Sequence, residues 1–320
     1  MKTRCVILLL ALATASLTAH AQTADWPTKP VRVVVPFAPG GSNDIIARLL
    51  APRLYEEFHQ QFVVDNRGGA GGQIGAYITV RANPDGYTVI VVSGSYAATP
   101  ALQKLAYDPV KDIAPIAIVA DGPMIMALNP AVKAANLKEF IDLARAKPGT
   151  LAFGSTGTGS IAHLAFERFA QETKTSMIHV PFSGAGPAVT ALLGGEIQFV
   201  FISPAPAVPH IKSGKLRALA VTGEQRWSGM PDLPAVNELV PGYSANVWFG
   251  MFAPAGTPKQ IVARLNQALA RAIKQPEIQE RFRGASLEPT HSTPEEFGRI
   301  IARDIAVWSK VAKDANIKLE

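Results

Sequence analysis

Short apolar runs and helical patterns alternate along most of the chain. Runs rich in β-branched residues and bounded by Pro, Gly or Asn predict strands, and apolar residues that recur every three to four positions predict the helices between them. This alternation is typical of α/β folds with a mainly parallel sheet. We predict strands at residues 31–35, 62–65, 87–92, 116–119, 124–128, 151–154, 177–180, 199–202, 216–221 and 248–252.

The end of the chain, after residue 252, has only helical patterns. Thr293, Pro294 and Glu296 combine an N-cap, a Pro at the first helical position and a Glu at the third, which predicts a helix start. Helices without a sheet of their own must cover an existing one. We therefore expect two α/β domains around a hinged cleft, each a mainly parallel sheet flanked by helices, joined by two strand-like crossings near 119–126 and 247–252. Domain 1 comprises 22–121 and 249–320, and domain 2 comprises 122–248.

Two predicted strand-to-helix junctions have glycine-rich turns, at residues 37–44 and 154–160. A helix start presents unpaired backbone N–H groups and the positive end of the helix dipole, which favours a nearby anion by roughly 0.3 to 1 kcal/mol. Ligands of open α/β sheets collect at the carboxyl ends of strands, where both turns lie. The pattern predicts that the two loops hold one small anion between the domains.

Candidate ligand-binding residues come from these turns and from other loops that follow predicted strands. Residues 37–44, 154–163 and 182–188 contain no Lys or Arg, so backbone N–H groups and hydroxyls would hold a carboxylate. Asp44 would repel an anion unless it is turned away, and we expect it to stabilise its loop. The candidates are Phe37, Pro39, Gly40, Gly41, Ser42, Ser95, Tyr96, Thr156, Thr158, Gly159, Ser160, Phe182, Ser183 and Ala185.

Other kinds of site find less support. Gly157, Gly159 and Ala162 fit a relaxed dinucleotide-binding pattern, but the next predicted strand ends without the required acidic residue. The chain has no G-x-S-x-G motif and no histidines at metal-ligand spacing, and His163 is expected to be a hydrogen-bonded helix residue. We predict no cofactor, no metal and no catalytic residues. A catalytic triad whose members are far apart in the sequence leaves no motif that could be detected in the chain.

The first residues have the order of a cleavable secretory signal. Lys2 and Arg4 precede an apolar run at 6–13, and small residues precede Gln22, so we predict a signal peptide at 1–21 and a periplasmic protein. The only cysteine, Cys5, lies inside this signal. Without Lys2 and Arg4 the chain keeps 29 basic and 25 acidic residues, an excess too small and too scattered to indicate nucleic acid binding.

Several motifs in order give the chain a family resemblance. They are Trp26-Pro27, Pro36-Phe37-Ala38-Pro39-Gly40-Gly41 with Asp44, Asn66-Arg67, Asn83-Pro84-Asp85-Gly86-Tyr87-Thr88, the segment 214–220 and the segment 252–258. The sequence resembles the substrate-binding proteins of tripartite tricarboxylate transporters, the Bordetella uptake gene family. The resemblance implies a two-domain periplasmic-binding-protein fold, type 2 like, that closes around an organic carboxylate and delivers it to membrane components of a transporter. Residues 37–42 and 156–160 would hold the carboxylate, with 182–185 as a wall.

One position departs from the family pattern. Relatives often have Asp after the strand at 199–202, where this chain has Ile202 followed by Ser203, and we add both residues to the candidates. Without that acid, a ligand ammonium has no partner, which favours a non-amino carboxylate. We expect a monomer that binds no nucleic acid. Two alternatives stay open: a secreted hydrolase of small esters or amides, and a ligand-sensing partner of a membrane receptor.

Overall fold

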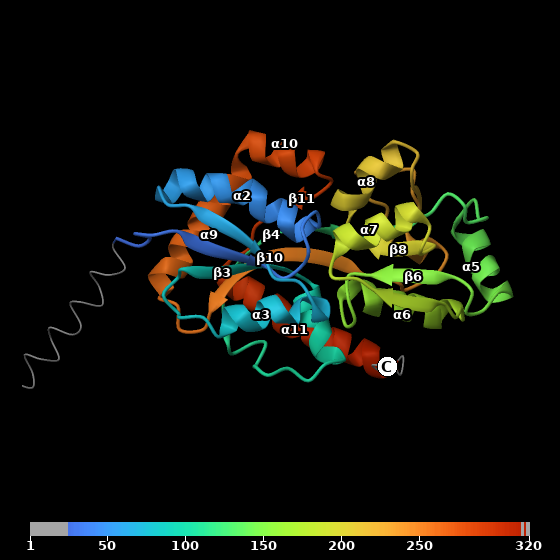
Figure 1. Ribbon diagram of the computed structural model, residues 1–320, viewed down its shortest axis with the longest axis horizontal. Helices are drawn as coiled ribbons and strands as arrows, with labels where there is room; N and C mark the ends of the chain where they lie inside the picture. The colour runs from blue at the N-terminus through green and yellow to red at the C-terminus, as the bar shows by residue number, and fades with distance from the viewer. Residues whose placement is uncertain (1–24, 315–316, 318–320) are drawn as a thin grey trace, which may run out of the picture.

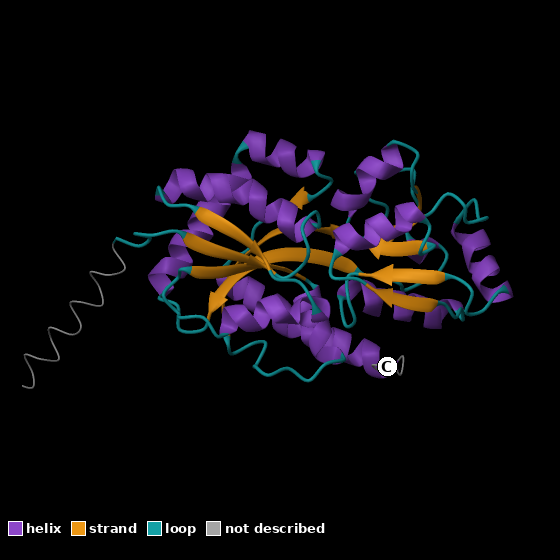
Figure 2. Ribbon diagram, in the orientation of Figure 1, coloured by secondary structure: helices purple, strands orange, loops and turns teal. Residues whose placement is uncertain are grey.

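Two sheets lie side by side, each with its own helices, in a computed structural model that describes residues 25–314 and residue 317 (Figure 1). The predicted signal peptide at 1–21 lies outside the described residues. We call the six-stranded sheet with its helices the first lobe, and the five-stranded sheet with its helices the second lobe (Figure 2). The two-sheet α/β architecture agrees with the sequence prediction.

The first lobe contains both ends of the described chain. Its strand order is β11-β4-β10-β3-β1-β2. Its strands are β1 (Val31–Val35), β2 (Phe62–Asn66), β3 (Thr88–Ser93), β4 (Ile113–Pro123), β10 (Asn246–Pro254) and β11 (Glu288–Pro289). Its helices are α2 (Ser42–Phe58), α3 (Gln73–Val80), α4 (Ser95–Ala98), α9 (Lys259–Lys274), α10 (Pro276–Gly284) and α11 (Pro294–Asp314), with short 3₁₀ turns η1 (Ala70–Gly72) and η2 (Thr99–Ala101).

The second lobe is built from the middle of the chain. Its strand order is β7-β6-β8-β5-β9. Its strands are β5 (Ile125–Leu128), β6 (Ala152–Ser155), β7 (Ile178–Pro181), β8 (Phe199–Ile202) and β9 (Arg217–Val221). Its helices are α5 (Leu137–Ala146), α6 (Ile161–Thr173), α7 (Ala185–Gly194) and α8 (Pro204–Lys212), with the 3₁₀ turn η3 (Val236–Glu238).

Both sheets are mixed, which corrects the prediction of mainly parallel sheets. β1 pairs in parallel with β2 and β3, and β6 pairs in parallel with β7 and β8. The other pairs are antiparallel. The reason is the route of the chain: β4 leads out of the first lobe and β10 returns to it, so these two neighbours run in opposite directions. Alternating strands and helices could not reveal these strand directions.

The two connections between the lobes lie next to each other. β4 ends at Pro123 and β5 begins two residues later, while β10 begins at Asn246, the register partner of Pro123. Figure 1 shows β10 running from the second lobe into the first sheet. The predicted crossings near 119–126 and 247–252 therefore form one short double-stranded bridge, which forms the floor of the space between the lobes.

The tail returns to the first lobe, as predicted. Asn266 of α9 donates a hydrogen bond to the carbonyl of Ile116 in β4 at 2.7 Å, and Trp248 of β10 donates one to Asp304 of α11 at 2.8 Å. Thr293 accepts a bond from the backbone N–H of Glu296, so the predicted helix start is confirmed. The tail also adds the two-residue strand β11, which the helical pattern did not predict. Among the described residues, no helix is long and apolar enough to span a bilayer.

Candidate ligand-binding site

A cavity of about 40 Å³ lies between the lobes. Its wall draws on both sheets and on the bridge between them. The lining residues are Phe37, Gly41, Ser42, Asn43, Ser93, Ser95, Met124, Thr156, Ile161, Ala162, Ala185, Phe201, Ile202, Ser203, Val247 and Phe249.

Four helices of eight residues or more begin at this wall. They are α2 from the first lobe and α6, α7 and α8 from the second. Each start adds a positive dipole end, worth up to about 2 kcal/mol for a partly buried anion. None of the wall residues in the described part of the chain is a Lys, Arg, His, Asp or Glu. The attraction for an anion therefore comes from backbone groups and hydroxyls.

The hydroxyls of Ser42 and Ser203 meet across the cleft, with 2.7 Å between their oxygens. A serine at a helix start often caps the helix, but here Gly41 is the N-cap of α2, in extended backbone and without a side-chain cap bond. Because Ser42 is the first helical residue, its hydroxyl faces the second lobe instead of capping α2. Both serines thus stand where two helix starts oppose each other.

Asp44 stabilises the first glycine loop, as predicted. Its Oδ2 accepts the backbone N–H of Gly40 at 3.1 Å, and its Oδ1 accepts bonds from Arg48 and Asn66 at 3.0 and 3.1 Å. Burial acts to raise the pKa of Asp44, but the bonds from Arg48, Gly40 and Asn66 outweigh it and hold the pKa below its usual value. Asp44 is therefore ionised, paired with Arg48, and outside the cavity wall.

The second glycine loop is held by a histidine. Ser160 caps α6 by accepting the backbone N–H of His163 at 3.3 Å, and the N–H of Gly159 donates to Nδ1 of His163 at 3.2 Å. The imidazole of His163 stacks on that of His179, with 3.9 Å between ring centroids. His163 is a hydrogen-bonded helix residue, as the sequence indicated. From this loop only Thr156 reaches the cavity wall.

Ser155 and His179 form a close pair behind the same loop, with 2.6 Å between Oγ and Nε2. Burial, with the charge of His163 as a second cause, lowers the pKa of His179 to about 3, so the imidazole is neutral. Ser155 also accepts the N–H of Gly157, is only 1% exposed and does not line the cavity. The pair supports the loop from inside the second lobe.

Three predicted site residues lie at contacts between the lobes instead of at the cavity. The carbonyl of Thr158 accepts a bond from Gln103 at 2.9 Å, that of Gly159 accepts one from Thr99 at 3.1 Å, and that of Ser183 accepts the N–H of Ala38 at 3.0 Å. We call these three bonds the lobe latch. They hold the lobes together around the cavity.

The latch depends on close approach of two backbones. Gly71, at φ +64°, lies where an added Cβ would come within 2.7 Å of the Thr158 carbonyl. A larger residue there would force the loops apart. The loop after β2 therefore contributes to closure, and not to the cavity wall.

Half of the sixteen candidates line the cavity: Phe37, Gly41, Ser42, Ser95, Thr156, Ala185, Ile202 and Ser203. Their part in binding stays a prediction. Pro39 and Gly40 face Gly186 of the second lobe, and Phe182 packs on the core of its own lobe. Tyr96 is in the first-lobe core, where its hydroxyl donates to the Pro109 carbonyl at 2.9 Å.

Sequence reasoning missed the other half of the wall: Asn43, Ser93, Met124, Ile161, Ala162, Phe201, Val247 and Phe249. Asn43 and Ser93 adjoin predicted site residues and could have been included. Met124, Val247 and Phe249 belong to the bridge, and the prediction of two crossings near 119–126 and 247–252 was the available signal for them. Among the described residues, no three His, Cys, Asp or Glu gather in a way that could hold a metal ion.

Comparison with known proteins places the chain in a family. BugT of Bordetella pertussis is 35% identical over 313 residues, covering 97% of this chain and 96% of BugT. The solved structure of R. palustris Rpa4515 with adipate is 35% identical, with a TM-score of 0.88, covering 92% of this chain and 99% of that one. MatC from Rhodopseudomonas palustris with bound malate is 32% identical, with a TM-score of 0.85, covering 89% and 99%.

A family model described as tripartite tricarboxylate transporter family receptor matches residues 46–317. The match spans both lobes, and it agrees with the resemblance that the sequence motifs indicated. The chain therefore belongs to the receptor family of tripartite tricarboxylate transporters.

Proposed function

We propose that this receptor captures a small organic carboxylate in the cavity between its lobes. The observation that supports it most is the meeting of four helix starts at a hydroxyl-bearing wall without charged side chains, among the residues described. Such a wall suits a single negative group held by N–H and O–H donors. The relatives bound to adipate and malate favour the same ligand class.

The ligand is a non-amino carboxylate. An ammonium group needs an acceptor such as a carboxylate, and the one acid near the first glycine loop, Asp44, is already bonded to Arg48, Gly40 and Asn66. At the position where relatives often have Asp, Ile202 is 1% exposed and lines the cavity. A buried ammonium without a partner would cost several kcal/mol.

The protein works as a monomeric, non-catalytic receptor in the periplasm. Residues 22–121 with 249–320 move as one domain against 122–248, and the lobe latch closes the cleft on the ligand. The closed form then delivers the carboxylate to the membrane components of the transporter. Micromolar affinity needs only about 8 kcal/mol net, which preformed loops and hinge closure can supply.

Calorimetry with matched ligands tests this function. Malate and aspartate differ only in a hydroxyl or ammonium at one carbon, so malate should bind more tightly. Adipamide, the neutral analogue of adipate, should not bind. Recovered ligand should be chemically unchanged by NMR, and ligand should raise Tm by mass action. Tighter binding of aspartate, or equal binding of the amide, would contradict the proposal.

A further inference from the structure

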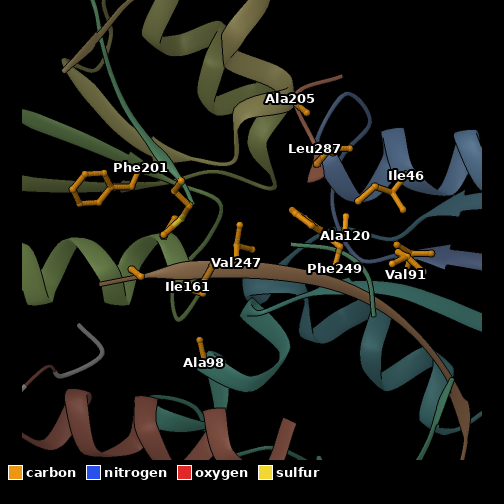
Figure 3. Packing of buried hydrophobic residues seen from close by; sticks show 14 of the residues in the cluster. Ile46, Val91, Ala98, Ala120, Ile161, Phe201, Ala205, Val247, Phe249 and Leu287 are labelled. Atoms are coloured by element: carbon orange, nitrogen blue, oxygen red, sulfur yellow. The ribbon is translucent and has the colours of Figure 1, made fainter. Parts of the chain in front are cut away.

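Part of the cavity wall is formed by large apolar side chains. They are Met124, Ile161, Phe201, Val247 and Phe249, each at most 4% exposed, and we call this set the apolar floor. In Figure 3, Val247 and Phe249 lie along β10, between Phe201 and Ile161 on the side of the second lobe and Ile46 and Val91 on the side of the first. Three of the five residues belong to the bridge, Phe201 belongs to β8, and Ile161 is the first residue of α6.

Backbone groups at the floor are already bonded. The N–H of Met124 donates to Oγ1 of Thr222 at 2.8 Å, and the carbonyl of Met124 accepts the N–H of Thr222 at 2.9 Å. The N–H of Ile161 donates to Oγ of Ser95 at 3.2 Å.

The backbone groups of the two β10 residues in the floor are also not free to bind a ligand. Val247 and Phe249 are in ladder register with Gly122 and Ser93. Their backbone groups lie in the plane of the sheet and their side chains stand out from it. A ligand tail at the floor therefore meets carbon surface and finds no spare donor among these groups.

The charge behind the floor is negative. Val247 and Phe249 also line a smaller hollow on the bridge, of about 10 Å³, and Asp121 and Glu288 line that hollow too. Glu288 accepts a bond from Nε1 of Trp227 at 3.1 Å, and it is the register partner of Asp121. These two carboxylates repel an anion at the floor.

We propose that the receptor selects monocarboxylates with an apolar tail over dicarboxylates, tricarboxylates and amino acids. This inference rests on the proposed function and specifies the ligand class of that same cavity. The carboxylate lies among Ser42, Ser203 and the opposed helix starts, and the tail lies against the apolar floor. A second carboxylate on the tail would lose its water at the floor, where the described lining residues offer no cation and only the hydroxyls of Ser93 and Ser95 lie beside it.

Calorimetry on the purified protein, titrated with pairs of equal chain length, tests the inference. The pairs are butyrate with succinate, hexanoate with adipate, and octanoate with suberate. In the pair that fits the cavity best, the monocarboxylate should bind at least about tenfold more tightly, because the second charge of its partner is desolvated without compensation.

The outcomes separate the inference from the proposed function. A dicarboxylate that binds as tightly as its monocarboxylate, or more tightly, overturns the inference and leaves carboxylate capture standing. If none of the six acids binds, and malate does not bind either, carboxylate capture itself fails and the inference fails with it.

A variant pair tests the floor directly. Met124→Lys keeps a long unbranched side chain and adds a cation, so the ratio of adipate affinity to hexanoate affinity should rise at least about tenfold. Met124→Leu is the matched apolar control and should keep the original ratio. A folded Met124→Lys protein with an unchanged ratio would overturn the placement of the tail at the floor.

Met124 is buried, so the lysine variant carries a risk of misfolding that circular dichroism would reveal. Val247→Thr then replaces it, because threonine has almost the shape of valine and adds only a hydroxyl. That hydroxyl should weaken hexanoate binding several-fold and leave adipate binding equal or stronger. Equal losses for both ligands would count against the proposal.

Discussion

The two glycine-rich loops look alike in sequence but perform different tasks in the structure. In each, a glycine with positive φ donates its N–H to the side chain four residues later: Gly40 to Asp44 in the first loop, and Gly159 to His163 in the second. The first loop then presents Gly41 and the start of α2 to the cavity. The second presents one residue to the cavity and uses its carbonyls for the lobe latch.

The difference follows from which groups each loop leaves available. The first loop precedes a helix whose cap has no side-chain bond, so its hydroxyl and amides can meet a ligand. In the second loop, the serine at the helix start caps the helix and the carbonyls accept bonds from the other lobe. A glycine-rich turn before a helix can thus serve either ligand binding or contact between the lobes. The hydrogen-bond partners of its hydroxyl and backbone groups determine which of the two it serves.

The largest effect on carboxylate affinity is expected at Gly41, in the first loop. Gly41→Phe should reduce carboxylate affinity by more than about 100-fold, because a large side chain would occupy the space between the helix starts. Gly41→Ala is the control: its Cβ would lie 3.4 Å from that of Ala185, an ordinary contact, and affinity should change little. Calorimetry measures both, and full affinity in the Phe variant would remove this loop from the site.

Asp44→Asn tests how the first loop is held. Loss of the charge-assisted bonds should cost about 1.5 to 3 kcal/mol of unfolding free energy and weaken ligand binding. The pKa of Asp44 is lower in the folded than in the unfolded protein, so its carboxylate makes its full contribution to the free energy of unfolding above about pH 4. That contribution is lost as the pH falls through the folded pKa. In denaturant unfolding, the difference between variant and wild type should be smaller at pH 3 than at pH 7.

Gln103→Ala tests the task assigned to the second loop. Removing one latch bond of about 0.5 to 1.5 kcal/mol should weaken ligand binding about 2- to 10-fold through easier opening. Neither lobe loses core contacts, so the Tm without ligand should stay close to that of the wild type. Stopped-flow kinetics should place the change in the dissociation rate, and a change confined to the association rate would argue against a latch.

His179→Gln should have the smallest effect at neutral pH. The folded pKa of about 3 lies below the unfolded value of 6.5, so the unfolded chain binds more protons between these values. Stability should therefore fall as the pH drops from about 6.5 toward 3. Glutamine can still bond Ser155 but does not titrate, so Tm measured across this range should fall less steeply in the variant. If Tm falls equally steeply with pH in the variant and the wild type, His179 is not the group that causes the loss of stability.

Local order was readable from the chain alone. Val31–Val35 and Phe199–Ile202 match their predicted strands residue for residue, because short β-branched and aromatic runs between breakers leave little choice of register. Thr293 caps its helix, as its spacing to Glu296 indicated. The lack of basic residues in the loops was likewise a property of the sequence, and the prediction of an anion site built from backbone and hydroxyl groups rests on it.

Tertiary structure alone decided which groups meet. The direction of β4 and β10, and with it the mixed character of both sheets, depends on a route that no local pattern records. Met124 and Val247 read as ordinary apolar strand residues, and they become a cavity floor only because the bridge lies between two lobes. Ser42 and Ser203 are 161 positions apart in the chain, yet their hydroxyls touch, since burial and chain connectivity bring two helix starts to one point.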